Sequence, residues 1–121
     1  MRVFVTGSSA WPDPLAVGQE LTKLYLQHGP YVLVHEGGGI GVDAAAHTWQ
    51  EWAGKELGCF EVRHPADYEH HGRGARVRKG AELVATGADL VVAFSLFADE
   101  ETRQIVGLAE EAGINVREIL S

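Results

Sequence analysis

The residue types best suited to chemistry lie in one short stretch, VHEGGGIGVD, which covers residues 34–43. Its glycines directly follow a carboxylate, Glu36, and they are Gly37, Gly38, Gly39 and Gly41. Glycines leave backbone N–H groups and the start of a following helix free to face an anion. Glu36 is a candidate general base, or a group that stabilises positive charge developing on a sugar ring. The pattern indicates a loop that contacts a small phosphorylated ligand, although a tight strand-to-helix turn has the same composition.

A second polar loop, TGSSAW, follows the first apolar run of the chain. The Gly7 backbone and the hydroxyls of Ser8 and Ser9 could hold another polar group of the ligand. Trp11 could cover a base or a sugar by stacking. The alternative is an ordinary polar turn in which Trp11 fills a gap beside Pro12.

Positive charge is concentrated in one segment, which carries half of the ten lysines and arginines: Arg63, Arg73, Arg76, Arg78 and Lys79. The last four lie at the start of a predicted helix, where cations oppose the helix dipole. An anion at the strand ends would account for this arrangement, and a solvated basic face is the alternative. We expect one or two of the four to contact a ligand, with Arg76 and Arg78 as the candidates.

Asp43 is placed to cap the helix predicted over 43–57, or alternatively to bond ribose hydroxyls. His47 lies four residues further on and therefore on the same helical face. His70 and His71 are adjacent in sequence and cannot share a helical face. We therefore predict no metal site and no resident cofactor.

These loops need a scaffold, and the sequence predicts one from five apolar runs that alternate with four segments of helical period. The strands are expected at 2–6, 31–35, 59–63, 89–94 and 115–119, and the helices at 14–28, 43–57, 74–86 and 100–112. This alternation predicts a single domain over 1–121, a Rossmann-like three-layer α/β/α sandwich with a five-stranded, mainly parallel sheet. The third and fifth runs alternate polar and apolar residues, as edge strands do. Ligands of such sheets bind at the carboxyl ends of the strands, which is where the loops above lie.

Composition narrows the class of protein further. The chain has 121 residues, a net charge of -7 and a single cysteine, Cys59, which we expect to be buried in a strand. The acidic balance argues against broad binding of nucleic acid. Because neither a signal peptide nor a membrane span is recognisable, we expect a soluble cytoplasmic protein. Trp49, Trp52 and Phe97 exceed what so small a core must bury, which predicts a homodimer or a larger homo-oligomer.

Four segments, in this order, resemble the SLOG superfamily over nearly the whole chain, and most closely its YspA-like branch: TGSSAW, GGGIGVDAAAH, HPADYEHHGRGARVRKGAELVATGADLVVAF and AGINVREI. The second segment is also similar to the DNA-processing protein A family. The superfamily further includes the Lonely Guy phosphoribohydrolases. The resemblance implies a Rossmann-like fold and a nucleotide or nucleotide-derived ligand at the glycine loop. It also implies the kind of ligand sensing attributed to members that act in conflict systems, including those of phages.

Departures from the family pattern bear on activity. Where the family usually has Gly-Ser-Arg, this chain has Ser9 in place of the arginine. Where it usually has Gly-Pro-x-Arg-Asn, Arg78 matches but the asparagine is absent. The phosphohydrolase motif Pro-Gly-Gly-x-Gly-Thr-x-x-x-Glu lacks its Pro, Thr and Glu here. The binding scaffold is therefore expected to be retained without the hydrolase signature.

Three functions follow from these observations. The favoured one is a protein that binds a nucleotide-derived small molecule as a sensor, carrier or sponge. The alternative is a hydrolase that cleaves a nucleotide N-glycosidic or phosphoester bond, with Glu36 as its catalytic residue. The least favoured is a single-stranded DNA binder, against which the acidic charge and the lack of a basic aromatic groove both argue.

Overall fold

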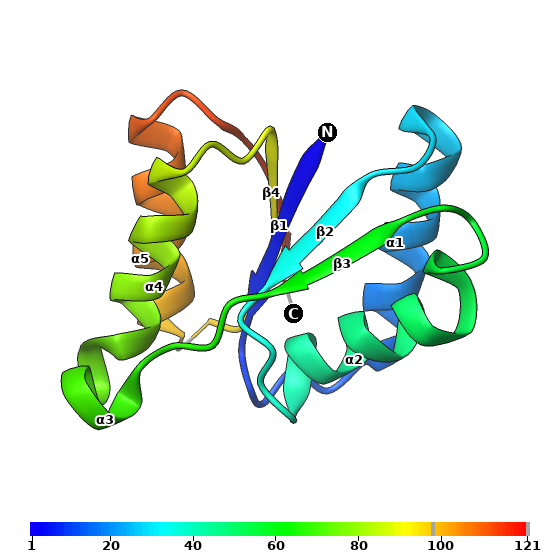
Figure 1. The fold of residues 1–121 in the computed structure, drawn as a ribbon. Coiled ribbons are helices and arrows are strands. Elements are labelled where there is room, and N and C mark those ends of the chain that lie inside the picture. Colours follow the sequence, from blue (N-terminus) through cyan, green and yellow to red (C-terminus); the bar gives the residue numbers. More distant parts are fainter. Residues whose placement is uncertain (98, 121) are drawn as a thin grey trace.

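The computed structural model describes residues 1–97 and 99–120 and contains the predicted alternation of strands and helices (Figure 1). The strands are β1 (Arg2–Gly7), β2 (Val32–His35), β3 (Phe60–Arg63), β4 (Leu90–Ser95) and β5 (Asn115–Leu120). The helices are α1 (Pro14–His28), α2 (Gly41–Trp49), α3 (Tyr68–His71), α4 (Ala75–Ala85) and α5 (Glu100–Glu111). A short π-helical turn, η1 (Gln50–Gly54), follows α2. A short 3-10 turn, η2 (Gly72–Gly74), precedes α4.

The five strands form one sheet in the order β3-β2-β1-β4-β5, and all neighbouring pairs are parallel. Helices α1 and α2 cover one face of this sheet, and α4 and α5 cover the other. The predicted three-layer sandwich is confirmed, with a sheet that is entirely rather than mainly parallel. The two strands with alternating patterns, β3 and β5, lie at its edges as predicted.

The direction of the connections changes between β1 and β4, which are hydrogen-bonded neighbours in the middle of the sheet. The chain leaves β1 towards α1 on one face and leaves β4 towards α5 on the other (Figure 1). Such a switch point opens a crevice at the carboxyl ends of the strands. In Figure 1 this edge of the sheet faces downward, where the loop after β2 and helix α3 also lie.

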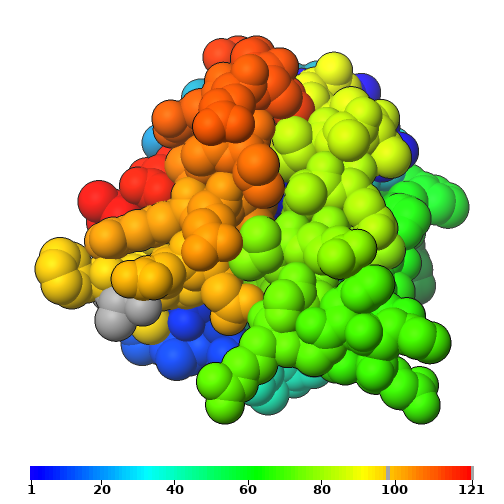
Figure 2. All heavy atoms as spheres, turned by 90° about the vertical axis from the view of Figure 1, so that its left-hand side faces the viewer, coloured from blue at the N-terminus to red at the C-terminus, as the bar shows by residue number. Residues whose placement is uncertain are grey.

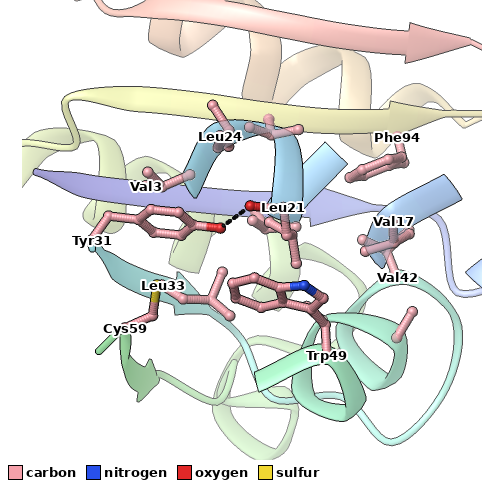
Figure 3. Packing of buried hydrophobic residues seen from close by; sticks show 14 of the residues in the cluster. Val3, Val17, Leu21, Leu24, Tyr31, Leu33, Val42, Trp49, Cys59 and Phe94 are labelled. Carbon is pink, nitrogen blue, oxygen red and sulfur yellow. Dashed lines mark hydrogen bonds between the residues drawn. The ribbon is translucent and has the colours of Figure 1, made fainter. Parts of the chain in front are cut away.

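The larger of two hydrophobic cores lies between the sheet and α1 and α2 (Figure 3). Tyr31 and Trp49 stack in it with their ring centroids 6.0 Å apart and their planes inclined by 3°. Both rings satisfy their polar atoms, since Tyr31 Oη donates to the Leu21 carbonyl at 2.7 Å and Trp49 Nε1 donates to Thr22 Oγ1 at 2.9 Å. Trp49 is only 7% exposed, so the prediction that it is surplus to the core is wrong.

The smaller core lies on the opposite face, under α4 and α5, and is built around Phe4, Val91 and Ile105. Cys59 is buried on the other side, directly before β3, close to its predicted place. None of the helices within the described residues is long and apolar enough to cross a membrane.

Aspartate side chains cap the starts of α1 and α5 but not the start of α2. Asp13 accepts from the Ala16 N–H at 3.2 Å before α1, and Asp99 accepts from the Thr102 N–H at 3.1 Å before α5. Helix α2, in contrast, begins at Gly41 without a side-chain cap, so the prediction that Asp43 caps it is wrong. Asp43 lies inside its first turn instead.

Gly41 explains why α2 begins early. Its φ of 64° is a conformation that favours glycine, and a Cβ there would lie 2.5 Å from the Ser8 carbonyl oxygen. The loop after β1 and the start of α2 pack backbone against backbone, which also places the Val42 N–H 3.3 Å from the Ser8 carbonyl oxygen. This glycine therefore has a packing role whatever the loop binds.

Candidate functional site

A cleft of about 480 Å³ opens at the carboxyl edge of the sheet. Seven of the residues predicted from sequence line it: Gly7, Ser9, Glu36, Gly37, Gly38, Asp43 and Arg76. Five further residues that the sequence did not single out complete it: Ile40, Pro65, Ala66, Tyr68 and Glu101. The lining therefore comes from the end of β1 and the loops after β1, β2 and β3, together with the first turns of α2, α3, α4 and α5. Its volume falls within the range of sites for small molecules, roughly 300–1,000 Å³.

Glu36 is the most unusual residue of the cleft. It follows β2 directly and is 8% exposed, and its Oε1 has no hydrogen-bond partner within residues 1–97 and 99–120. Burial and, to a smaller extent, the nearby Asp43 carboxylate raise the pKa of Glu36 to about 7, although Arg76 acts in the opposite direction. Near neutral pH this carboxyl is therefore partly protonated and can either donate or accept a hydrogen bond.

Asp43 connects the glycine loop to α2. Its Oδ2 accepts a hydrogen bond from the Gly38 N–H at 3.1 Å, and the next N–H towards β2, that of Gly37, donates to His35 Nδ1 at 2.9 Å. Burial raises the pKa of Asp43, while His35 and the Gly38 N–H favour its charged form. Both glycine N–H groups are thus already bonded within the chain. A phosphate that took the Gly38 N–H would have to displace Asp43.

Arg76 is the cation of the cleft, and it too is engaged by the chain. Its guanidinium donates to the Gly7 carbonyl at 2.6 Å and to Thr102 Oγ1 at 2.5 Å, and it lies 3.4 Å from Asp99 Oδ1. These bonds join the end of β1 to the start of α5 across the switch point. Because its side chain is only 14% exposed, Arg76 acts first as a brace for the cleft.

Arg78, the other predicted arginine, does not line the cleft. It lines a neighbouring hollow together with His70, His71 and Arg73. Figure 2 shows the face of the molecule on which α4 and α5 lie, and residues of both helices line this hollow. Residues two apart on a helix point to different sides, which separates Arg78 from Arg76. The hollow and the cleft are adjacent, because Glu101 lines both.

Trp11 lies in the core rather than in the cleft. It is 8% exposed, its ring contacts Phe94 edge-on at a centroid distance of 5.4 Å, and its Nε1 donates to the Asp13 carbonyl at 2.8 Å. The structure thus gives it the gap-filling role that was the alternative to stacking on a ligand.

Ser8 and Gly39 are likewise placed outside the cleft lining. Ser8 is buried and shapes the turn after β1, because its Oγ accepts from the Ala10 N–H at 3.0 Å. Gly39 is exposed, and a Cβ there would meet no atom within 4 Å. Gly41 also lies outside the cleft lining, where the loop after β1 packs against the start of α2.

A hydrogen-bond network that the sequence did not predict lies behind the glycine loop. The fully buried His35 contacts Glu61 with Nε2 to Oε2 at 2.7 Å, and His47 Nδ1 lies 3.0 Å from both Glu61 oxygens. Burial raises the pKa of Glu61, but the hydrogen bonds and charges of the two histidines outweigh it and lower that pKa overall. With Glu51, whose carboxylate is exposed, His47 and Glu61 offer three ligand atoms within 4.8 Å of one another, a spacing that could hold a metal ion.

Glu101 and Tyr68 were missed for different reasons. Glu101 carried a signal, because it starts a helix directly after a strand and so had to lie at the carboxyl edge. A carboxylate in the first turn of a helix is, however, also explained by the helix dipole alone, so the residue type does not by itself indicate a site. Tyr68 lies in the segment after β3 that was expected to be a loop, and the structure places it in α3, which Asp67 caps by accepting from the His70 N–H at 3.1 Å.

Comparison with known proteins agrees with the resemblance noted in the sequence. The model of the YspA, cpYpsA-related SLOG family matches residues 1–71, which include Glu36 and the glycine loop. The chain is similar to the Gene 61 protein of Mycobacterium phage D29, with 40% identity over 120 residues that cover 95% of this chain and 93% of the phage protein. No solved structure matches the chain. The chain therefore belongs to the YspA, cpYpsA-related SLOG family.

Proposed function

We propose that this chain binds a nucleotide or a nucleotide-derived small molecule in the Glu36 cleft. The observation that carries the proposal is the buried Glu36 carboxyl, whose Oε1 has no partner within the described residues. Leaving a buried acceptor unpaired costs about 1–3 kcal/mol, which a ligand recovers if it supplies a hydrogen-bond donor. Family membership is consistent with nucleotide-related binding, and the position at the switch point is where ligands of such sheets bind.

The charges of the cleft favour one part of such a ligand over another. Glu36, Asp43 and Glu101 all line it, and the guanidinium of Arg76 is already bonded to the chain. Three carboxyl groups repel a phosphate but suit donors such as ribose hydroxyls or the amino group of a base. We therefore place the nucleoside part of the ligand against Glu36.

The phosphates of the ligand belong outside the cleft in this arrangement. The neighbouring hollow that carries His70, His71, Arg73 and Arg78 begins at Glu101, where the cleft ends. Phosphates extending from a nucleoside in the cleft would reach this more basic surface. The acidic cleft and the more basic hollow beside it thus fit a molecule that has a neutral end and an anionic end.

The pKa of Glu36 gives this proposal a proton signature. A ligand that donates to Glu36 stabilises the ionised carboxylate and lowers a pKa that lies near 7 in the free protein. Binding at pH 7 should therefore release protons. Calorimetric titrations in buffers of different ionisation enthalpy measure this release, and proton uptake on binding would contradict the assigned contact.

A ligand panel tests the proposal directly. Thermal shift and calorimetry with nucleosides, nucleotides, ADP-ribose species and cyclic nucleotides should reveal at least one compound that stabilises the protein. Glu36→Ala should weaken its binding about 10–100-fold, the expected loss of a charged hydrogen bond. The matched control is Glu100→Ala, an exposed carboxylate in the first turn of α5 that does not line the cleft.

Two results of this panel would count against the proposal. Stabilisation by no compound would reject nucleotide binding itself. If Glu36→Ala and Glu100→Ala weakened ligand binding equally, or if neither weakened it, the protein would still be a nucleotide binder but the cleft would be rejected as the binding site.

A nucleotide hydrolase is the second candidate, and one observation favours it. A carboxyl with a pKa of about 7 beside a second carboxyl is suited to proton transfer at neutral pH. Chromatography after incubation with the panel would detect a released base or phosphate. Release that Glu36→Gln abolishes would support catalysis, whereas recovery of the bound compound intact supports binding alone.

The biological role we propose is that of a sensor, carrier or sponge for this small molecule. The similarity to a phage protein is compatible with a role in conflict between phage and host. Mass spectrometry of small molecules released from the purified protein would identify the ligand. A nucleotide-derived mass that disappears in Glu36→Ala is the expected result.

A further inference from the structure

A second concave surface lies between α1 and α2, separate from the cleft. This groove has a volume of about 920 Å³, and none of its lining residues lines the cleft. Three large apolar side chains of the groove are exposed to solvent: Leu15 by 74%, Leu26 by 76% and Trp52 by 81%. Contiguous apolar surface of this kind marks an interaction site on a folded protein.

The groove carries both a projection and a recess. Trp52 projects from η1 after α2, and small residues line the groove beside it: Gly18 on α1, Ala44 and Ala45 on α2, and Ala53 on η1. A twofold interface uses the same patch on both subunits, so that patch must contain the features that complement each other. A bulky indole next to a recess lined by small residues meets this requirement.

The charge of the groove indicates which partner fits it. The chain has seventeen Asp and Glu residues and a net charge of -7, but Lys23 is the one charged residue in the groove lining. Two copies of this acidic chain can therefore meet here without placing carboxylates of the two groove linings against each other. A nucleic acid, in contrast, would find a single cation, Lys23, among the residues that line the groove.

We infer that a second copy of this chain docks in the α1–α2 groove to form a twofold dimer, with Trp52 of each protomer packed into the groove of its partner. Helix α2 lies between the two sites, because Gly41 lines the groove and Asp43 lines the cleft. The dimer therefore holds the helix that supports the glycine loop and leaves the cleft open. This inference does not depend on the proposed ligand.

Light scattering coupled to size exclusion tests this dimer. The wild-type chain should elute with twice its 13.1 kDa mass across a concentration series, and both Trp52→Glu and Leu15→Glu should shift it to a monomer. Both side chains are exposed, so circular dichroism should show that the variants stay folded. The matched control is Phe97→Glu, because Phe97 is 84% exposed but lies outside the groove, and this variant should remain dimeric.

Tryptophan emission gives a second readout. Trp11 and Trp49 are buried in the fold, whereas Trp52 is exposed, so dissociation on dilution should shift the emission of the wild type to the red. A wild-type monomer at every concentration would overturn the inference, even if the groove then captured an apolar compound or another protein. A dimer that survives both groove substitutions but is lost in Phe97→Glu would overturn it equally.

Discussion

The two ends of β2 carry buried polar side chains that differ in one respect. Tyr31 precedes the strand and is 3% exposed, and its hydroxyl donates to the Leu21 carbonyl at 2.7 Å (Figure 3). Glu36 follows the strand and is 8% exposed, but its Oε1 is unpaired within the described residues. Buried polar groups that serve only the fold are almost always paired. The comparison therefore separates a residue that folding explains from one that it does not.

Burial acts on the ionisation of both residues, with different consequences. It raises the pKa of Tyr31 far above neutral pH, where the phenol stays protonated and keeps its hydrogen bond. It raises the pKa of Glu36 to about 7, so this group changes its charge within the physiological range. The core end of β2 is thus insensitive to pH, and the cleft end is not.

The largest expected effect is a loss of stability at the core end of β2, where Tyr31 lies. Tyr31→Ala removes a ring that stacks on Trp49 at 6.0 Å, and it should lower the free energy of unfolding by about 3–5 kcal/mol. Denaturant unfolding should show this loss equally at pH 4 and pH 8. A loss below about 1 kcal/mol would mean that the stack does not hold α2 to the sheet.

A smaller effect of opposite sign is expected at the cleft end. The folded pKa of Glu36, about 7, lies above its ordinary value of 4.5, so the native state binds more protons between these values. Stability then falls as the pH rises from about 4.5 to 7. Glu36→Gln cannot ionise and should exceed the wild type at pH 8 by up to about 3 kcal/mol, with no difference near pH 4.

The same denaturant experiment with Glu100→Gln provides the background for this measurement. That carboxylate is exposed and outside the cleft, so its removal should change stability by less than about 0.5 kcal/mol at either pH. If Glu36→Gln and Glu100→Gln changed the free energy of unfolding alike, burial of the unpaired Glu36 carboxyl would have no energetic cost. The contrast between the two ends of β2 would then disappear.

The smallest effect isolates the hydrogen bond at the core end. Tyr31→Phe keeps the ring and removes the bond to Leu21, which should cost about 1 kcal/mol. Because the pKa of Tyr31 lies far above neutral, this loss should be the same at pH 4 and pH 8. A loss that grew with pH would show that the core end titrates as well.

Much of the fold could be predicted because its signals are local. The apolar runs and helical periods are read within a few residues, and α1 was predicted at its observed bounds, 14–28. Glu36 and the glycines were found because loops after parallel strands must meet at one edge. In contrast, α3 has four residues and no buried side chain, so it leaves no apolar period to detect.

The remaining features depend on contacts between distant segments. Glu61 lies 26 residues from His35 and 14 from His47, and their network exists only because β2, β3 and α2 pack together. An aromatic residue in this loop is a reasonable candidate for stacking on a ligand, and only the contact of Trp11 with Phe94 shows that it belongs to the core. The spacing alone could have shown that Arg76 and Arg78 do not line the same site, because side chains two residues apart on a helix point to different sides.

A crystal structure of the protein with the tightest compound of the panel is the most direct test of the central claim, that the cleft around Glu36 is a binding site. The expected result is a ligand at the carboxyl ends of β1 and β2, with a hydroxyl or amino donor within about 3.2 Å of Glu36 Oε1. A ligand found only in the α1–α2 groove or only in the hollow around Arg73 and Arg78, with Glu36 still unpaired, would contradict it.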